Sequence, residues 1–478
     1  MLPQCGLSTQ GRAVSVCALL GVLLYAAVVQ AACGCFGCLS GAPCALRTGP
    51  PEDDTLIDFG GRDAELGGGI AAFRILNRWG RTASHGATTP GSPVTLTWGF
   101  APDGTTLPSE PQDDGTTRND PSDLISFLDN QVGNPASDPL IGDLTDRSWF
   151  PIVKRAYDRW SELSGITFEY EPNDDGVPIS GSTSSTRWGV RGVRADMRLS
   201  GHFIDGQSGS NTLAYNWFPS GGDMVIDTSN TSFYSNSFAD NRRLRNVLMH
   251  ELGHGLGFRH LESDNSSQLM EPFISVAFDG PQIDDILAAH RNYGDVHEKN
   301  GGNNAFATAK HAGDFADGDT WAIGTDGATN VVLETMTDFI SIDDDSDVDY
   351  FRFTVDQPSL VDISLQQVGR TYNEGPQNGE QSPLDTSMLS ELQIALQELT
   401  GGIGVLTHAT GASESPTTRA IRQIELEPGK DYYVRVTGTQ NNVQLYRLDL
   451  AVTAVPEPTT LAVLGLAPLA CLSRRRAA

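Results

Sequence analysis

Cysteine is absent from the interior of this 478-residue chain, whose seven cysteines all lie near its two ends. No thiol lies between Cys44 and Cys471, so a thiol-dependent enzyme is excluded. Basic residues are also scarce: 32 lysines and arginines face 60 aspartates and glutamates, which gives a formal net charge of -28. This charge argues strongly against binding to nucleic-acid phosphates, and it suits divalent cations or simple solubility in a salty medium.

Long apolar runs are missing except near the two ends. Arg12 precedes an apolar run from Ala13 to Val29, which is short for a membrane-spanning helix of about 20 residues. Small residues follow it, so residues 1–31 are predicted to be an export signal. Residues 32–70 lack periodicity and are predicted to be a flexible lead-in. In an exported protein its four cysteines are expected to form disulfides of undefined connectivity: Cys33, Cys35, Cys38 and Cys44.

From about residue 71 the hydrophobic pattern alternates between short strands and amphipathic helices. Three helices are predicted, over the segments "WFPIVKRAYDRWSEL", "NRRLRNVLMHELGHGLG" and "IDDILAAHRNYG", with Asp240 as a candidate cap of the second. Residues 71–297 are therefore predicted to form an α+β unit in which a twisted sheet packs against three helices.

After a predicted linker at residues 298–304, the pattern becomes all-β. Apolar residues alternate in Phe351, Phe353 and Val355, and again in later segments, with Pro428-Gly429 as a turn. Residues 305–453 are predicted to form a separate β-sandwich.

The stretch "HELGHGLGFRH", from His250 to His260, has the spacing of a metal site. On a helix, His250 and His254 share a face, so both imidazoles reach one ion. Gly257 can adopt the positive φ that ends the helix and turns the chain back, which delivers His260 as a third ligand. Three protein ligands leave a fourth position for water, as catalytic zinc requires.

Zinc lowers the pKa of such a water, and Glu251 is placed to accept its proton as general base. The shorter pattern H-E-x-x-H also arises by chance on buried helices. The extended pattern with a third histidine, followed ten residues later by Met270, is far more specific.

These residues resemble the metzincin zinc endopeptidases, and most of all the matrixins, over residues 71–297. The resemblance implies one catalytic zinc on the three histidines, Glu251 as the base, and Met270 in the Met-turn beneath the metal. "NTLAYNWFPSGGDMVID" is similar to the matrixin segment that holds the substrate-binding edge strand, here Leu213 and Ala214.

The chain also departs from the matrixin pattern. The histidines of the usual structural zinc would fall at Tyr215 and Val225, so a second zinc is not expected. Four acids match calcium-ligand positions of the family, although acids that merely cap turns are an open alternative: Asp196, Asp205, Asp223 and Asp227. The matrixin cysteine-switch sequence is not visible, and the substrate preference cannot be carried over.

Two further resemblances concern the C-terminal part. "SDVDYFRFTVDQPSLVDISL" resembles the pre-peptidase C-terminal β-sandwich of secreted bacterial peptidases. The acidic stretch Asp343–Asp349 is interpreted as a solvated turn, with calcium binding as the alternative, although it lacks the glycine and final glutamate of an EF-hand loop. Residues 454–478 resemble the PEP-CTERM sorting signal, with "VPEP", the apolar run Leu461–Leu472 and Arg474–Arg476. That resemblance implies transient membrane association and removal by a sorting protease; a permanent C-terminal anchor is the alternative.

The sequence therefore predicts an exported zinc endopeptidase that hydrolyses protein or peptide substrates and binds no nucleic acid. We expect it at the cell surface, in the outer envelope or outside a Gram-negative-type bacterium. Two alternatives are a non-catalytic surface or matrix protein with a peptidase-like fold, and an adhesin that depends on its β-sandwich. Glu251 favours the enzyme, because a binding protein has no need of a base.

Overall fold

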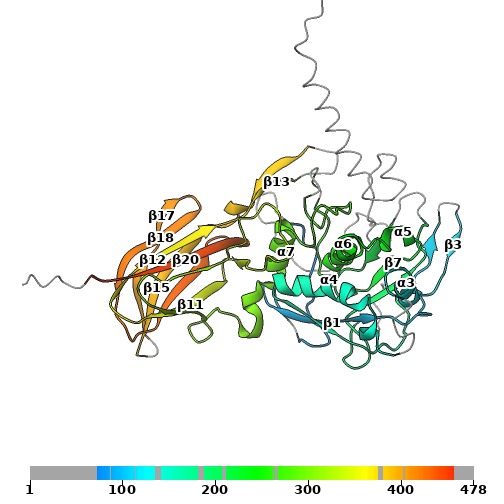
Figure 1. The fold of residues 1–478 in the computed structure, drawn as a ribbon, viewed down its shortest axis with the longest axis horizontal. Helices are drawn as coiled ribbons and strands as arrows, with labels where there is room; N and C mark the ends of the chain where they lie inside the picture. The colour runs from blue at the N-terminus through cyan, green and yellow to red at the C-terminus, as the bar shows by residue number, and fades with distance from the viewer. Residues whose placement is uncertain are drawn as a thin grey trace, which may run out of the picture.

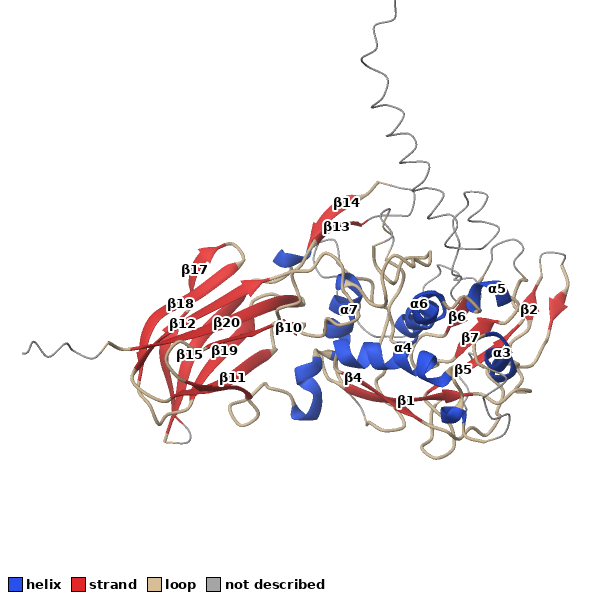
Figure 2. Ribbon diagram, in the orientation of Figure 1, coloured by secondary structure: helices blue, strands red, loops and turns tan. Residues whose placement is uncertain are grey.

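The computed structural model describes residues 73–456 apart from short gaps at 87, 113–114, 135–141, 181–187, 207–211, 262, 264–266, 375–379 and 402–403. The predicted export signal, all seven cysteines and most of the sorting segment lie outside these residues. Figures 1 and 2 show an α+β unit followed by an all-β unit, which confirms the predicted fold class. Within the described part of the chain, no helix is both long and apolar enough to cross a membrane.

The first unit is built on a five-stranded sheet with the order β4-β1-β5-β7-β6. Its first four strands run parallel: β4 (Ile166–Tyr170), β1 (Val94–Phe100), β5 (Met197–His202) and β7 (Met224–Asp227). The short strand β6 (Ala214–Asn216) runs antiparallel to β7 and forms the edge of the sheet. A small separate ribbon pairs β2 (Glu110–Pro111) with β3 (Thr117–Arg118).

Three longer helices accompany this sheet: α4 (Phe150–Leu163), α6 (Phe238–Gly255) and α7 (Ile283–Tyr293). Shorter ones are α3 (Leu124–Gln131), α5 (Thr231–Tyr234) and the 3-10 turn η1 (Leu144–Asp146). The predicted apolar face of α4 is buried, and its Tyr157 ring stacks on Trp98 of β1 with centroids 4.1 Å apart. Trp160 Nε1 donates to the Met249 carbonyl at 3.0 Å, which ties α4 to α6.

The predicted cap at Asp240 is wrong. Asp240 has φ 56° and ψ 54°, which is left-handed rather than the extended backbone that a capping residue adopts. Its carbonyl instead accepts from Arg245 Nε at 2.9 Å. The Arg245 guanidinium thus binds the backbone near the start of α6, where a capping side chain was expected.

The second unit is a β-sandwich of two sheets. One contains β10 (Ile340–Ile342), β20 (Gln444–Ala454), β12 (Ser359–Gln367), β18 (Thr418–Leu426) and β17 (Ala412–Ser415), with β9 (Thr320–Ile323) on β20. The other contains β16 (Gly404–Thr410), β15 (Leu392–Thr400), β19 (Tyr432–Gly438), β11 (Val348–Val355) and β8 (Lys310–Phe315). Burial alternates along β11, as predicted, because one face of each sheet packs inward.

A hairpin of β13 (Thr371–Glu374) and β14 (Ser382–Asp385) forms its own two-stranded sheet, followed by the 3-10 turn η3 (Thr386–Met388). The hairpin projects away from the two sandwich sheets, above α7 in the view of Figure 2.

The two units share part of one apolar core. Residues of the second unit belong to the same buried cluster as the α7 residues Ile286 and Leu287: Val332, Phe339, Val368, Val443 and Leu445. Polar contacts also cross the junction, including Arg159 Nη1 to the Met336 carbonyl at 2.9 Å. The predicted linker contains most of the 3-10 turn η2 (Val296–Gly301), where Glu298 is buried. Cutting the chain there would expose apolar surface on both sides.

Candidate metal centre

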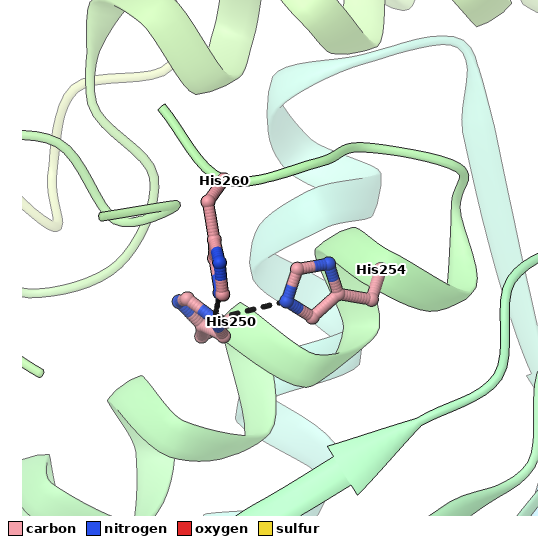
Figure 3. Close-up of side chains that lie close together, drawn as sticks. All are labelled: His250, His254 and His260. Atoms are coloured by element: carbon pink, nitrogen blue, oxygen red, sulfur yellow. Dashed lines mark hydrogen bonds between the residues drawn. The ribbon is translucent and has the colours of Figure 1, made fainter. Parts of the chain in front are cut away.

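Helix α6 presents His250, Glu251 and His254 inside the protein, where all three are buried. The helix ends at Gly255, and Gly257 follows with φ +100°. A Cβ at position 257 would lie 1.9 Å from the Asn77 carbonyl oxygen, so both the conformation and the space require glycine there. The turn brings His260 back over the helix, opposite the other two histidines (Figure 3).

The three imidazoles converge through their Nε2 atoms. His250 Nε2 lies 3.1 Å from His254 Nε2 and 3.3 Å from His260 Nε2. At the far side of each ring, His250 Nδ1 is 2.7 Å from the Leu269 carbonyl and His254 Nδ1 is 2.7 Å from the Phe258 carbonyl. A carbonyl only accepts, so both Nδ1 atoms carry the proton and both Nε2 atoms present bare lone pairs.

Two lone pairs this close repel each other unless a cation lies between them. Zn–N bonds of about 2.0–2.1 Å in a tetrahedral site place the ligand nitrogens about 3.3 Å apart, which agrees with the observed spacing. The site therefore fits a zinc ion by the chemistry and by the spacing of its donors.

Burial keeps these rings neutral. Burial lowers the pKa of His250 to about 4. It also lowers the pKa of His254 and of His260 well below the usual value, with a further contribution from the neighbouring histidines. Neutral imidazole is the form that binds a metal, so the folded protein holds its ligands ready.

Among the described residues, Glu251 has no hydrogen-bond partner that explains its burial. Both carboxylate oxygens are buried, and neither finds a hydrogen-bond donor among the described residues. Burial alone raises the pKa of Glu251 well above its usual value. An unsatisfied buried carboxyl is costly, which indicates that its partner is a group held beside the histidines, such as a water molecule.

Met270 lies directly under α6. A Cβ on Gly253 would come within 2.3 Å of Met270 Sδ, so a larger residue there would force the Met270 side chain to shift. The backbone beside it is fixed by Asp285, whose carboxylate accepts from the N–H groups of Leu269 at 2.8 Å and Met270 at 3.0 Å. The resemblance pointed to Met270 but not to Asp285, although "QIDD" before an apolar helix is a recognisable capping signal.

The residues predicted to bind substrate lie at the edge of the five-stranded sheet, where an extended substrate would pair as an additional strand. Ala214 opens β6, the edge strand of the sheet, and Leu213 precedes it. The Leu213 carbonyl is already used, because it accepts from Tyr234 Oη at 2.6 Å and from the Asp227 N–H at 2.9 Å. Substrate binding at this edge stays a prediction.

The four acids predicted for calcium are occupied as hydrogen-bond acceptors. Asp196 accepts from the Thr97 N–H at 2.9 Å and the Ala83 N–H at 2.8 Å, and Asp227 accepts from the Ser229 N–H at 2.9 Å. Asp205 accepts from the Thr212 N–H at 2.6 Å and Asp223 from the Arg198 N–H at 3.1 Å. The described residues do not bring these four together as one group of ligands. Calcium at these positions remains a prediction.

The two positions where matrixins carry the histidines of a structural zinc are used differently here. Tyr215 Oη donates to Glu110 at 2.7 Å, and Val225 packs in a small apolar cluster with Ala101 and Leu107. Glu110 is also 3.3 Å from His202 Nε2. Both side chains thus serve packing and hydrogen bonding here, and the expected lack of a second zinc remains open to test.

A second group of ligand-type residues was only partly predicted, because the sequence analysis considered calcium at Asp343–Asp349 but did not include Glu298. Glu298, Asp347 and Asp349 bring carboxylate oxygens within 4.8 Å of one another. The solvated turn predicted at Asp343–Asp349 is wrong in this respect, because Asp343, Asp347 and Asp349 are buried. Burial and the neighbouring acids raise the pKa of Glu298 to about 9 and that of Asp347 to about 7. As oxygen donors, these groups suit a hard cation.

Comparison with known proteins supports the resemblances predicted from the sequence. Residues 141–294 match the family model described as Matrixin, and residues 454–477 match the PEP-CTERM protein-sorting motif. The chain is 31% identical over 141 residues to Matrix metalloproteinase-16 of Rattus norvegicus, which covers 28% of this chain and 21% of that protein. It is 29% identical over 149 residues to the hatching enzyme of Paracentrotus lividus, covering 31% and 23%.

The chain therefore spans less than a quarter of the length of these relatives. Among solved structures, the pre-peptidase C-terminal domain of a collagenase from Bacillus anthracis aligns with 30% of this chain and 95% of that chain. The identity is 15% and the TM-score 0.17, which carries no inference of its own. The matched matrixin region contains the three converging histidines, Glu251 and Met270.

Proposed function

We propose that the protein is an exported zinc-dependent endopeptidase that hydrolyses peptide bonds of proteins outside the cytoplasm. The observation that carries this proposal is the metal centre itself. Three Nε2 atoms converge on one point, and the buried carboxyl beside them has no hydrogen-bond partner among the described residues. The matrixin match over residues 141–294 supports the same reaction.

The residues divide the chemistry among themselves. His250, His254 and His260 hold the metal through Nε2, and the carbonyls of Leu269 and Phe258 orient the first two rings. When bound, zinc supplies Lewis acidity that lowers the pKa of a water and polarises the scissile carbonyl. Glu251 takes the proton from the attacking water and passes it to the leaving amine, which its raised pKa favours. The free edge of β6 offers backbone groups that an extended substrate pairs with.

Metal analysis tests the centre independently of substrate choice. We expect about one zinc per chain, because the second histidine set is replaced at Tyr215 and Val225. Removal of zinc by a chelator should abolish hydrolysis of an unfolded protein substrate, and added zinc should restore it. Two tightly bound zincs per chain would show that the structural site survives with other ligands.

The non-catalytic alternative fits the site less well. A buried carboxyl without a partner costs about 1–3 kcal/mol or more of folding free energy. A binding protein gains nothing from Glu251 to offset this penalty, whereas a hydrolase uses the group in every turnover. Hydrolysis by the full chain, with loss on zinc removal, separates the two.

We also propose that the protein is exported and then released from the membrane. The PEP-CTERM match at residues 454–477 supports handling by a sorting system. A sorting protease acting near Val455–Pro458 should leave a mature protein without the signal and without the tail. Intact-mass measurement of the protein from the cell surface or medium checks this, and a mass that includes residues up to Ala478 would indicate a permanent anchor.

A further inference from the structure

The β13–β14 hairpin links the sandwich to the α+β unit at one buried point. Tyr372 of β13 is 2% exposed, and its Oη donates to Asp284 Oδ1, which lies 88 residues earlier in the chain. Asp284 is 3% exposed and lies in the first turn of α7. In the view of Figure 2 the hairpin lies above this helix. A residue of the second unit therefore satisfies a buried carboxyl of the first.

The first turn of α7 is also what holds the Met-turn. Asp285, next to Asp284, accepts from the N–H groups of Leu269 and Met270, and the Asp284 N–H donates to Gln268 Oε1 at 3.1 Å. The Leu269 carbonyl in turn accepts from His250 Nδ1 at 2.7 Å. Tyr372 is thus connected to a metal ligand through one helix turn and one loop.

Two other contacts from the sandwich reach the same region. The Val332 N–H donates to Gln282 Oε1 at 2.9 Å, and Gln282 is the residue that caps α7. Glu374, two residues beyond Tyr372 in the strand, interacts electrostatically with Arg74, which also acts on His260. The contact through Tyr372 is therefore part of a broader support and not an isolated hydrogen bond.

Without Tyr372, Asp284 would be left buried beside other acids. Burial raises the pKa of Asp284 well above its usual value, and the charges of Asp285 and Glu374 raise it further. Loss of the donated hydrogen bond leaves an unsatisfied buried group next to Asp285, the residue that orders the Met-turn. We expect the first turn of α7 to shift in response, and with it the loop whose Leu269 carbonyl orients His250.

We propose that Tyr372 is a positioning residue of the metal centre, so that the sandwich completes the site by holding the first turn of α7. This inference rests on the proposed zinc centre. Mutation of a residue that hydrogen-bonds to a metal ligand commonly changes metal affinity or activity by about 10–100-fold. Tyr372 does not contact a ligand itself and acts through the first turn of α7, so we expect a change in metal affinity at the lower end of this range.

The test is Tyr372→Phe in the full chain. We expect zinc to be lost to a chelator about 10-fold faster than from the wild type. The visible spectrum of the cobalt-substituted protein should change, and kcat should fall while KM stays nearly constant. The matched control is Tyr432→Phe, because Tyr432 is equally buried in the sandwich and its Oη donates to the Glu427 carbonyl at 2.9 Å. This control should lower stability to a similar extent and leave zinc loss and the cobalt spectrum unchanged.

A double-mutant cycle identifies the partner. Asp284→Asn and Tyr372→Phe together should release zinc no faster than the more severe single variant, because both remove the same link. Zinc loss from Tyr372→Phe at the wild-type rate, or simple addition of the two single effects, would overturn the inference. Zinc release is measured without a substrate. A protein that binds zinc and hydrolyses nothing would therefore contradict the proposed function and leave this inference standing.

Discussion

Replacement of Glu251 by glutamine should leave zinc binding intact and lower kcat/KM by about 10²–10⁴-fold, the usual contribution of a general base. Glutamine keeps the shape of the side chain, and Glu251 is not one of the converging ligands. It replaces a buried ionisable carboxyl by a neutral amide of the same shape, so the variant should be about as stable as the wild type. Metal content, thermal unfolding and hydrolysis of a peptide substrate are measured on the same sample.

The control is Glu171→Gln, another buried glutamate of the same unit, whose oxygens accept from the Gly192 and Asn173 N–H groups. That variant should lose stability and keep its kcat. Full activity of Glu251→Gln would remove the general base from the proposed mechanism, whereas loss of zinc would show that Glu251 is a ligand.

Replacement of Gly257 by alanine should cost both stability and zinc. A side chain at φ +100° is strained by about 1–3 kcal/mol, and its Cβ would also meet the Asn77 carbonyl oxygen at 1.9 Å. Backbone has to move, and His260 depends on this turn to face His250. We expect lower thermal stability, zinc content well below that of the wild type, and hydrolysis reduced in proportion to the zinc retained.

Gly80→Ala is the matched control, because a Cβ at position 80 meets nothing within 4 Å and φ there is not in the positive range. It should behave as the wild type. If Gly257→Ala binds zinc normally, the turn is more tolerant than its geometry indicates, and His260 reaches the metal by another path.

The convergence of the three histidines was predictable because its information is local. Helical spacing puts His250 and His254 on one face, a glycine permits the return turn, and the third histidine follows within eleven residues of the first. The α4 face was predictable for the same reason, since its apolar period of 3.6 survives in the sequence. In these cases one short segment determines both the conformation and which side chains come together.

What the sequence did not reveal depends on contacts between distant segments. The acids of Asp343–Asp349 look solvated in the sequence, because nothing local shows that η2 and β11 bury them together. The bond from Tyr372 to Asp284 joins two units that were predicted to be separate. Asp240 has the residue type of a cap, but Arg245 holds the backbone in a left-handed conformation that side-chain propensity does not predict.

Because the apolar cluster continues from α7 into the sandwich, we expect the two units to unfold together rather than as independent domains. Domains joined by a flexible linker open independently, and one can be shed while the other continues to work. Here, the opening of the sandwich takes apolar neighbours away from α7, whose Asp285 holds the Met-turn by hydrogen bonds. We therefore expect that opening of either unit disturbs the support of the proposed zinc site.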